Sequence, residues 1–145
     1  MIGLLQRVTE ARVEVDQQSI AAIGAGLVVL IGVEKTDTGA KADRLLERLL
    51  GYRVFPDREG RMNLSLADIG GDLLLVPQFT LPADTKKGMR PGFSAAAPPE
   101  TGKALFDYLL EQAKTRHGKV QSGQFGTDMQ VTLTNDGPVT FWLQT

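Results

Sequence analysis

The chain has 145 residues, 42% of them apolar and 23% charged, and this composition predicts a single folded domain spanning residues 1–145. It has no cysteine and one histidine, His117, which excludes a disulfide scaffold, cysteine-ligated metal centres and thiol catalysis. Sixteen basic and seventeen acidic side chains give a formal net charge of −1, so a polyanionic partner would have to bind a local cluster of cations.

No segment has the pattern of a membrane span or a signal peptide. The longest apolar run, residues 24–33, is about half the length that a membrane-spanning helix needs. Arg7 interrupts the N-terminal apolar residues where a signal peptide has its apolar centre. We therefore expect a cytoplasmic protein with no membrane partner.

The first half of the chain predicts several strands and one helix. Residues 2–15 alternate in a way that suggests two strands, and a turn follows at Asp16. The continuous apolar run 27–33 is typical of a strand covered on both faces. Thr38 is a suitable helix N-cap, and leucines recur at helical spacing from there to Gly51. Three further strands are expected at residues 20–23, 52–55 and 73–76.

The second half predicts a long loop, a helix and two closing strands. Residues 81–99 contain four prolines and a basic cluster, which favours an ordered loop without regular structure. Pro99 is suited to the first turn of a helix that ends before Gly118. Strands are expected at residues 125–133 and 139–143. The fold class is therefore α/β, with mixed, largely antiparallel sheets packed by two main helices.

Two stretches concentrate positive charge without an intervening acid. Their ordinary interpretation is a solvated loop and the cationic last turn of a helix. The first contains Lys86, Lys87 and Arg90, and the second contains Lys114, Arg116 and Lys119.

A first candidate site lies where the expected strand 73–76 meets proline. Gln78, Phe79 and Thr80 follow Pro77 directly. A backbone forced out of the sheet at this point leaves N–H groups unpaired, and such groups can form an oxyanion hole. The alternative is an ordinary strand end with the Phe79 ring packed inward.

A second candidate site is the Asn-Asp-Gly-Pro segment that contains Gly137 and Pro138. Asn-Asp-Gly alone is typical of a hairpin loop. A Gly-Pro bond, however, adopts the cis form at a cost of only about 0.5–1 kcal/mol, and a cis bond turns its flanking carbonyls in a direction that a trans bond cannot offer. Both interpretations stay open on the local sequence.

Familiar catalytic signatures are absent. The chain has no phosphate-binding G-x-x-x-x-G-K-[ST] loop and no G-x-S-x-G elbow. His117 falls at an expected helix C-terminus, where a cation interacts favourably with the exposed carbonyls, so we interpret it as structural.

Together the two candidate sites resemble the signatures of the D-aminoacyl-tRNA deacylase family, also called D-tyrosyl-tRNA deacylases. In that family the signatures read S-Q-F-T and N-x-G-P-V-T. The similarity covers essentially the whole chain. It includes the segments MIGLLQRV, GVEK, GYRVF, MNLS, QFTL, GMRPGFS and NDGPVTFWLQ.

The resemblance implies a three-layer fold, a homodimer and hydrolysis of the ester that joins a D-amino acid to tRNA, with glycyl esters also accepted. It implies a cis Gly137–Pro138 peptide that enters the partner subunit's site and reads chirality. It places the ester near Gln78, Phe79 and Thr80, with the Gln78 and Phe79 N–H groups as oxyanion donors. A water assisted by the ribose 2′-hydroxyl is favoured over Thr80 as nucleophile, because threonine is weak without an adjacent base. No cofactor and no metal is expected.

Phe125 and Met129 are candidates for the adenosine pocket, with core packing as the alternative.

One departure bears on substrate choice. Pro77 stands where the family usually has serine, and proline has neither a hydroxyl nor an N–H. Animal-type deacylases that remove L-alanine from mischarged tRNA also have proline there, but they lack the phenylalanine retained here as Phe79. We therefore favour the D-specific activity, with the L-alanine activity as second choice. A non-catalytic RNA-binding module is disfavoured by the balanced charge and by an aromatic content of only 6%.

Overall fold

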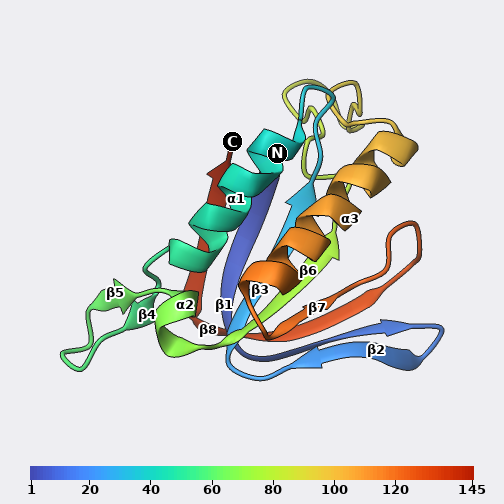
Figure 1. Cartoon of the computed structure of the whole chain (residues 1–145). Helices are drawn as coiled ribbons and strands as arrows, with labels where there is room; N and C mark the ends of the chain where they lie inside the picture. The colour runs from blue at the N-terminus through green and yellow to red at the C-terminus, as the bar shows by residue number, and fades with distance from the viewer.

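The computed structural model describes all 145 residues. One long strand, β1 (Ile2–Val15), organises the main sheet (Figure 1). The first half of β1 lies between β3 (Gly26–Gly32) and the end of β8 (Gln130–Gln144), and its second half lies between β2 (Gln18–Ile23) and the start of β8. These pairings are antiparallel. A parallel part follows, in which β6 (Asp72–Pro77) pairs with β3, and β7 (Val120–Ser122) pairs with β6.

Two helices, α1 (Gly39–Gly51) and α3 (Pro99–Arg116), lie side by side on one face of this sheet (Figure 1). The Thr38 side chain caps α1 by accepting from the Lys41 N–H. Proline at the first position of α3 leaves no helical hydrogen bond unmade, because the first N–H of a helix has no partner within it. Their buried faces meet the sheet through α1 residues Leu45, Leu46 and Leu49 and α3 residues Phe106, Leu109 and Ala113.

Apolar side chains fill both faces of the central strands. The larger cluster lies between the sheet and the two helices. The smaller cluster joins the opposite face of β3 and β6 to β2 and the second half of β1, which fold back across it. The result is three layers: helices, central strands and a β layer.

The remaining elements are short. Helix α2 (Leu66–Ile69) begins with a capping box between Ser65 and Asp68. Strands β4 (Phe55–Pro56) and β5 (Met62–Leu64) form a separate two-stranded sheet. No helix is long and apolar enough to cross a membrane. The mixed α/β class and the two main helices are as the sequence predicts.

Several predicted boundaries are wrong. Residues 2–15 form one strand. β1 pairs first with β3 and then with β2, and register shifts against β8 let it continue without leaving the sheet. The expected strands 125–133 and 139–143 are one strand, β8, which starts only at Gln130. The expected strand 52–55 is reduced to Phe55–Pro56.

Candidate active site

The first candidate site is a β-turn at the end of β6, residues 78–81, here called the catalytic turn. The Leu81 N–H donates to the Gln78 carbonyl at 3.3 Å and closes the turn, so that Phe79 and Thr80 are its two central residues. The Gln78 N–H donates to the Ile31 carbonyl at 2.7 Å and ties the start of the turn to β3. The turn is therefore held by main-chain bonds to a central strand.

Two main-chain donors in the turn are free. The N–H groups of Phe79 and Thr80 have no acceptor within the chain, and both residues are exposed. The expectation that Gln78 supplies an oxyanion donor is wrong, because its N–H is engaged by Ile31. Neighbouring free N–H groups on a fixed turn are the arrangement that stabilises an oxyanion.

The side chains of the turn contain no base. Gln78 Nε2 donates to Thr80 Oγ1 at 2.6 Å, so the hydroxyl is held by an amide rather than activated. The Phe79 ring is 65% exposed and lies 5.4 Å from the Phe93 ring, so the interpretation of Phe79 as packed inward is wrong. His117 Nε2 lies 2.7 Å from the Gly71 carbonyl oxygen, before the start of β6, about 20 Å from the turn.

The two candidate adenosine-pocket residues differ in their placement. A Cβ added to Gly123 would lie 2.7 Å from Met129 Sδ and 3.4 Å from Pro77 Cδ, so Met129 lies beside the residue that precedes the turn. Phe125 packs against Phe106, with ring centroids 6.4 Å apart, and contributes to the main core. Both side chains are half-buried and both contact an apolar cluster.

The second candidate site is an excursion within β8. Gln6 pairs with Thr140 and Val8 pairs with Asn135, so residues 136–139 have only Arg7 opposite them and no partner in the ladder. We call these four residues the Gly-Pro excursion. Its Gly137–Pro138 peptide bond is cis, and both residues are exposed. The hairpin-loop interpretation is wrong, because the segment interrupts one strand and does not join two.

The Asn135 side chain fastens the base of the excursion. Its Oδ1 accepts from the Val139 N–H at 2.6 Å, and its Nδ2 donates to the Val139 carbonyl and to Thr140 Oγ1 at 3.3 and 2.9 Å. The Val139 side chain is buried beneath. No side chain donates to the carbonyl oxygens of Gly137 or Pro138, which leaves both free to accept.

Arg7 holds the excursion from the neighbouring strand. Its Nε donates to the Asp136 carbonyl at 2.9 Å, and its Nη1 donates to the Val54 carbonyl at 2.6 Å. Its side chain is only 12% exposed. Sequence reasoning missed this residue. The available signal was an arginine in the mainly apolar first half of β1, where a buried guanidinium needs acceptors.

The chain does not bring its two candidate sites together. Ile31, Gly3 and Leu143 lie successively across the sheet from Pro77, and Leu143 is five residues along β8 from Pro138. Three strand spacings and five residues of rise separate the sites by about 20 Å. Neither site alone presents both the free N–H donors and the free carbonyl oxygens.

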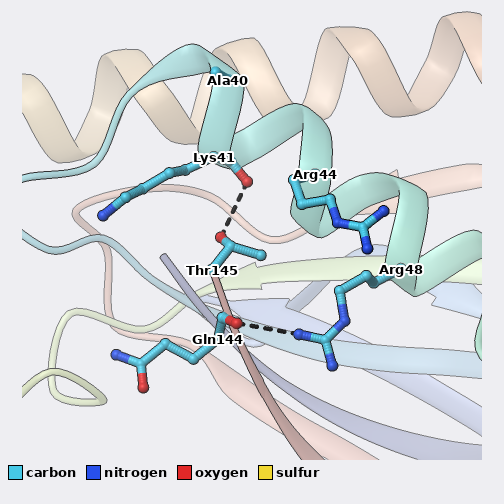
Figure 2. Close-up of a pocket in the computed structure, with 6 residues that line it drawn as sticks. All are labelled: Ala40, Lys41, Arg44, Arg48, Gln144 and Thr145. Carbon is cyan, nitrogen blue, oxygen red and sulfur yellow. Dashed lines mark hydrogen bonds between the residues drawn. The ribbon is translucent and has the colours of Figure 1, made fainter.

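One cavity lies away from both candidate sites (Figure 2). It has a volume of about 430 Å³ and lies between α1 and the end of β8. Arg48 Nη1 donates to the Gln144 carbonyl at 3.1 Å, and Thr145 Oγ1 donates to the Lys41 carbonyl at 3.1 Å. Arg44 is paired with Glu47. Because each of these side chains already has a partner within the chain, we assign the cavity no role in the chemistry.

Titratable groups with shifted pKa values also lie outside both sites. The Arg61 N–H lowers the pKa of Asp57, and the Ser65 N–H lowers the pKa of Asp68. A hydrogen bond to Asp43 raises the pKa of Tyr108. No group of three or more His, Asp or Glu side chains is placed to hold a metal ion.

Fold and site together define a mixed α/β protein whose candidate site consists of main-chain groups. The family model described as D-Tyr-tRNA(Tyr) deacylase matches residues 4–144. A D-aminoacyl-tRNA deacylase of Pseudomonas fluorescens (strain Pf0-1) is 66% identical over 145 residues, covering 100% of both chains. One from Nitrosococcus oceani is 62% identical over 144 residues, covering 99% of this chain and 93% of the relative. The chain belongs to the D-Tyr-tRNA(Tyr) deacylase family.

Two solved structures are also similar. A protein described as c-Myc DNA Unwinding Element Binding Protein is 39% identical, with a TM-score of 0.95 over 100% of this chain and 99% of its own. A probable eukaryotic D-amino acid tRNA deacylase shares the fold, with a TM-score of 0.88 at 20% identity over 99% of this chain and 98% of its own.

Proposed function

We propose that the protein hydrolyses the ester between a D-amino acid and the 3′-terminal adenosine of tRNA, releasing both, as a chiral proofreading step of translation in the cytoplasm. The observation that carries this proposal is the pair of free N–H groups at Phe79 and Thr80 in a member of this family. Their position after a rigid strand suits stabilisation of the tetrahedral oxyanion that ester hydrolysis forms.

The chemistry proceeds through water. Water adds to the ester carbonyl carbon, whose oxygen becomes the oxyanion held by the two N–H groups. The carbon–oxygen bond to the ribose then breaks, and the ribose oxygen takes up a proton. The neighbouring ribose 2′-hydroxyl assists the attacking water, since the Gln78 amide and Thr80 hydroxyl supply position and no base. This scheme uses no metal and no cofactor.

Chirality is read by the Gly-Pro excursion. The free carbonyl oxygens of Gly137 and Pro138 accept hydrogen bonds from the substrate's α-ammonium. A selector made of main chain ignores the amino-acid side chain, so it accepts many D-amino acids. An L-isomer either clashes or leaves its ammonium unpaired, which supplies discrimination on the order of 10⁴. Glycine has no side chain to exclude, so glycyl-tRNA is also hydrolysed.

A homodimer completes the site. Because the excursion lies about 20 Å from the catalytic turn of its own chain, the α-ammonium at one turn must be reached by the excursion of a second copy. The sheet face opposite the helices supports this proposal. Leu4 pairs there with Leu30 and Trp142, and Trp142 is 51% exposed. Leu4 and Leu30 are half-buried, and an apolar patch that stays partly exposed on a sheet face is typical of an interface between subunits.

The L-alanine activity is the second candidate, and Pro77 is the observation that favours it. Pro77 pairs with Ile31 at the end of β6 and offers no hydroxyl next to the turn. The exposed Phe79 ring favours the D-specific activity, because the L-alanine branch lacks this phenylalanine.

The test is hydrolysis of four substrates by the purified protein: D-Tyr-tRNA, L-Tyr-tRNA, Gly-tRNA and L-Ala-tRNA. We expect rapid loss of the D-tyrosyl and glycyl esters and a D-to-L rate ratio for tyrosine of at least about 10³. Equal rates on both tyrosyl esters would refute the chiral function. Preference for L-Ala-tRNA would select the second candidate.

A further inference from the structure

The loop between the catalytic turn and α3 has three cations that the proposed chemistry does not use. Lys86, Lys87 and Arg90 are exposed and make no ion pair within the chain. The only acid in residues 81–99 is Asp84, whose Oδ1 accepts the Lys86 backbone N–H. We call the three side chains the loop cations.

The other basic stretch is engaged inside the molecule. Lys114 pairs with Glu111 at 3.0 Å, Arg116 pairs with Asp43 at 3.1 Å, and Lys119 donates to the Gly70 carbonyl at 3.0 Å. In a chain with a formal net charge of −1, three neighbouring cations without such partners are a local concentration of positive charge.

The loop is anchored next to the catalytic turn. Asp84 and Gly92 exchange two main-chain hydrogen bonds of 2.7 and 2.9 Å, which hold the segment of the loop cations between them. The Phe93 ring then packs against Phe79 of the turn, with centroids 5.4 Å apart. Arg90 is three residues from Phe93, so its Cα lies within about 11 Å of the Phe93 Cα.

The end of the loop is tied to the residues that directly follow β3, the strand that supports the turn. The Lys35 N–H donates to the Ala95 carbonyl, and the Ala97 N–H donates to the Val33 carbonyl, at 3.0 and 2.9 Å. In Figure 1 the loop, in yellow, accordingly stands beside the connection from β3 to α1. The loop cations are therefore presented at the end of the sheet where the substrate ester would bind.

We propose that the loop cations bind the phosphate backbone of the tRNA acceptor end while its terminal ester occupies the catalytic turn. This inference rests on the proposed function. A nucleic-acid strand carries one phosphate per nucleotide, so the nucleotides next to the terminal adenosine bring negative charge within reach of the loop. Lysine and arginine contacts of this kind position the substrate without reading its sequence.

The test compares two triple variants with equal charge changes. One replaces the loop cations (Lys86→Gln, Lys87→Gln, Arg90→Gln), and the control makes the same change at Lys114, Arg116 and Lys119. Both are assayed on D-Tyr-tRNA and on 2′(3′)-O-D-tyrosyl-adenosine, a substrate without phosphates, over a range of salt concentrations.

The loop variant should lose roughly 10- to 100-fold in kcat/KM on D-Tyr-tRNA, mainly through KM, and its log–log salt slope should be shallower by about 2 to 3. Its rate on the tyrosyl-adenosine should stay within about twofold of wild type, and the control should retain the wild-type salt slope.

Three outcomes would overturn the inference: an equal loss in both triple variants, an equal loss on both substrates, or unchanged kinetics of the loop variant on D-Tyr-tRNA. If the wild-type protein hydrolyses neither D-tyrosyl ester, the proposed function itself fails.

Discussion

The oxyanion role of the catalytic turn can be tested by removing one main-chain hydrogen. Phe79→Pro deletes the free N–H at the first central position of the turn, where proline is commonly tolerated. The hydrogen bond that closes the turn runs from the Leu81 N–H to the Gln78 carbonyl, so it does not involve the Phe79 N–H and is kept. Loss of one oxyanion donor costs about 2.7–4 kcal/mol in the transition state, so we expect kcat to fall by roughly 10²- to 10³-fold.

Phe79→Ala is the matched control, because it removes the same ring and keeps the N–H. The ring is 65% exposed, so neither variant should lose much stability, and their thermal unfolding midpoints should be similar. Single-turnover hydrolysis of D-Tyr-tRNA measures the chemical step directly. If the proline variant reacts as fast as the alanine variant, the Phe79 N–H does not stabilise the oxyanion.

Four further predictions concern other groups. Asn135→Ala removes three hydrogen bonds at the base of the excursion, each worth about 0.5–1.5 kcal/mol, and should lower the D-to-L rate ratio, whereas the surface control Asn63→Ala should not. Thr80→Ala should keep hydrolysis within about tenfold, and an acyl ester trapped on Thr80 would contradict this. His117→Ala, or a chelator, should cost less than about tenfold, and complete inactivation would refute the scheme. The pKa of Asp68 is lowered in the folded protein, so its stabilising effect is present above the unfolded-state value of about 3.9 and is lost as pH falls. Asp68→Asn should therefore weaken the pH dependence of the unfolding midpoint between about pH 5 and 3.

Local sequence predicts those parts of the fold that local interactions stabilise. Helix α1 is an example, since the Thr38 cap and the spacing of the leucines are both readable and both are observed. The continuity of β8 is not readable in this way. Asn-Asp-Gly-Pro favours a turn, and only its pairing with β1 on both sides keeps it within a strand.

The residues of the candidate site can be predicted from local sequence, but their hydrogen-bond partners cannot. The motifs alone indicate Gln78, Phe79, Thr80, Gly137 and Pro138 as its residues. Which N–H groups are free depends on β3, because the Ile31 carbonyl occupies the Gln78 N–H. The role of Arg7 depends on Asp136 and Val54, which are 129 and 47 residues away. Contacts over such separations follow from the fold and leave no local pattern.

We propose that each active site combines the catalytic turn of one chain with the Gly-Pro excursion of another. The most direct measurement pairs two defective chains, Phe79→Pro and Gly137→Ala. In the second, an added Cβ would lie 2.7 Å from Val139 Cγ2 at a backbone φ of +142°.

Co-expression with two different affinity tags isolates the heterodimer, in which one site has both its turn and its excursion intact. We expect this heterodimer to hydrolyse D-Tyr-tRNA at about half the wild-type rate, although each parent homodimer is nearly inactive. A heterodimer no more active than the average of its parents would show that the site is not shared between two chains.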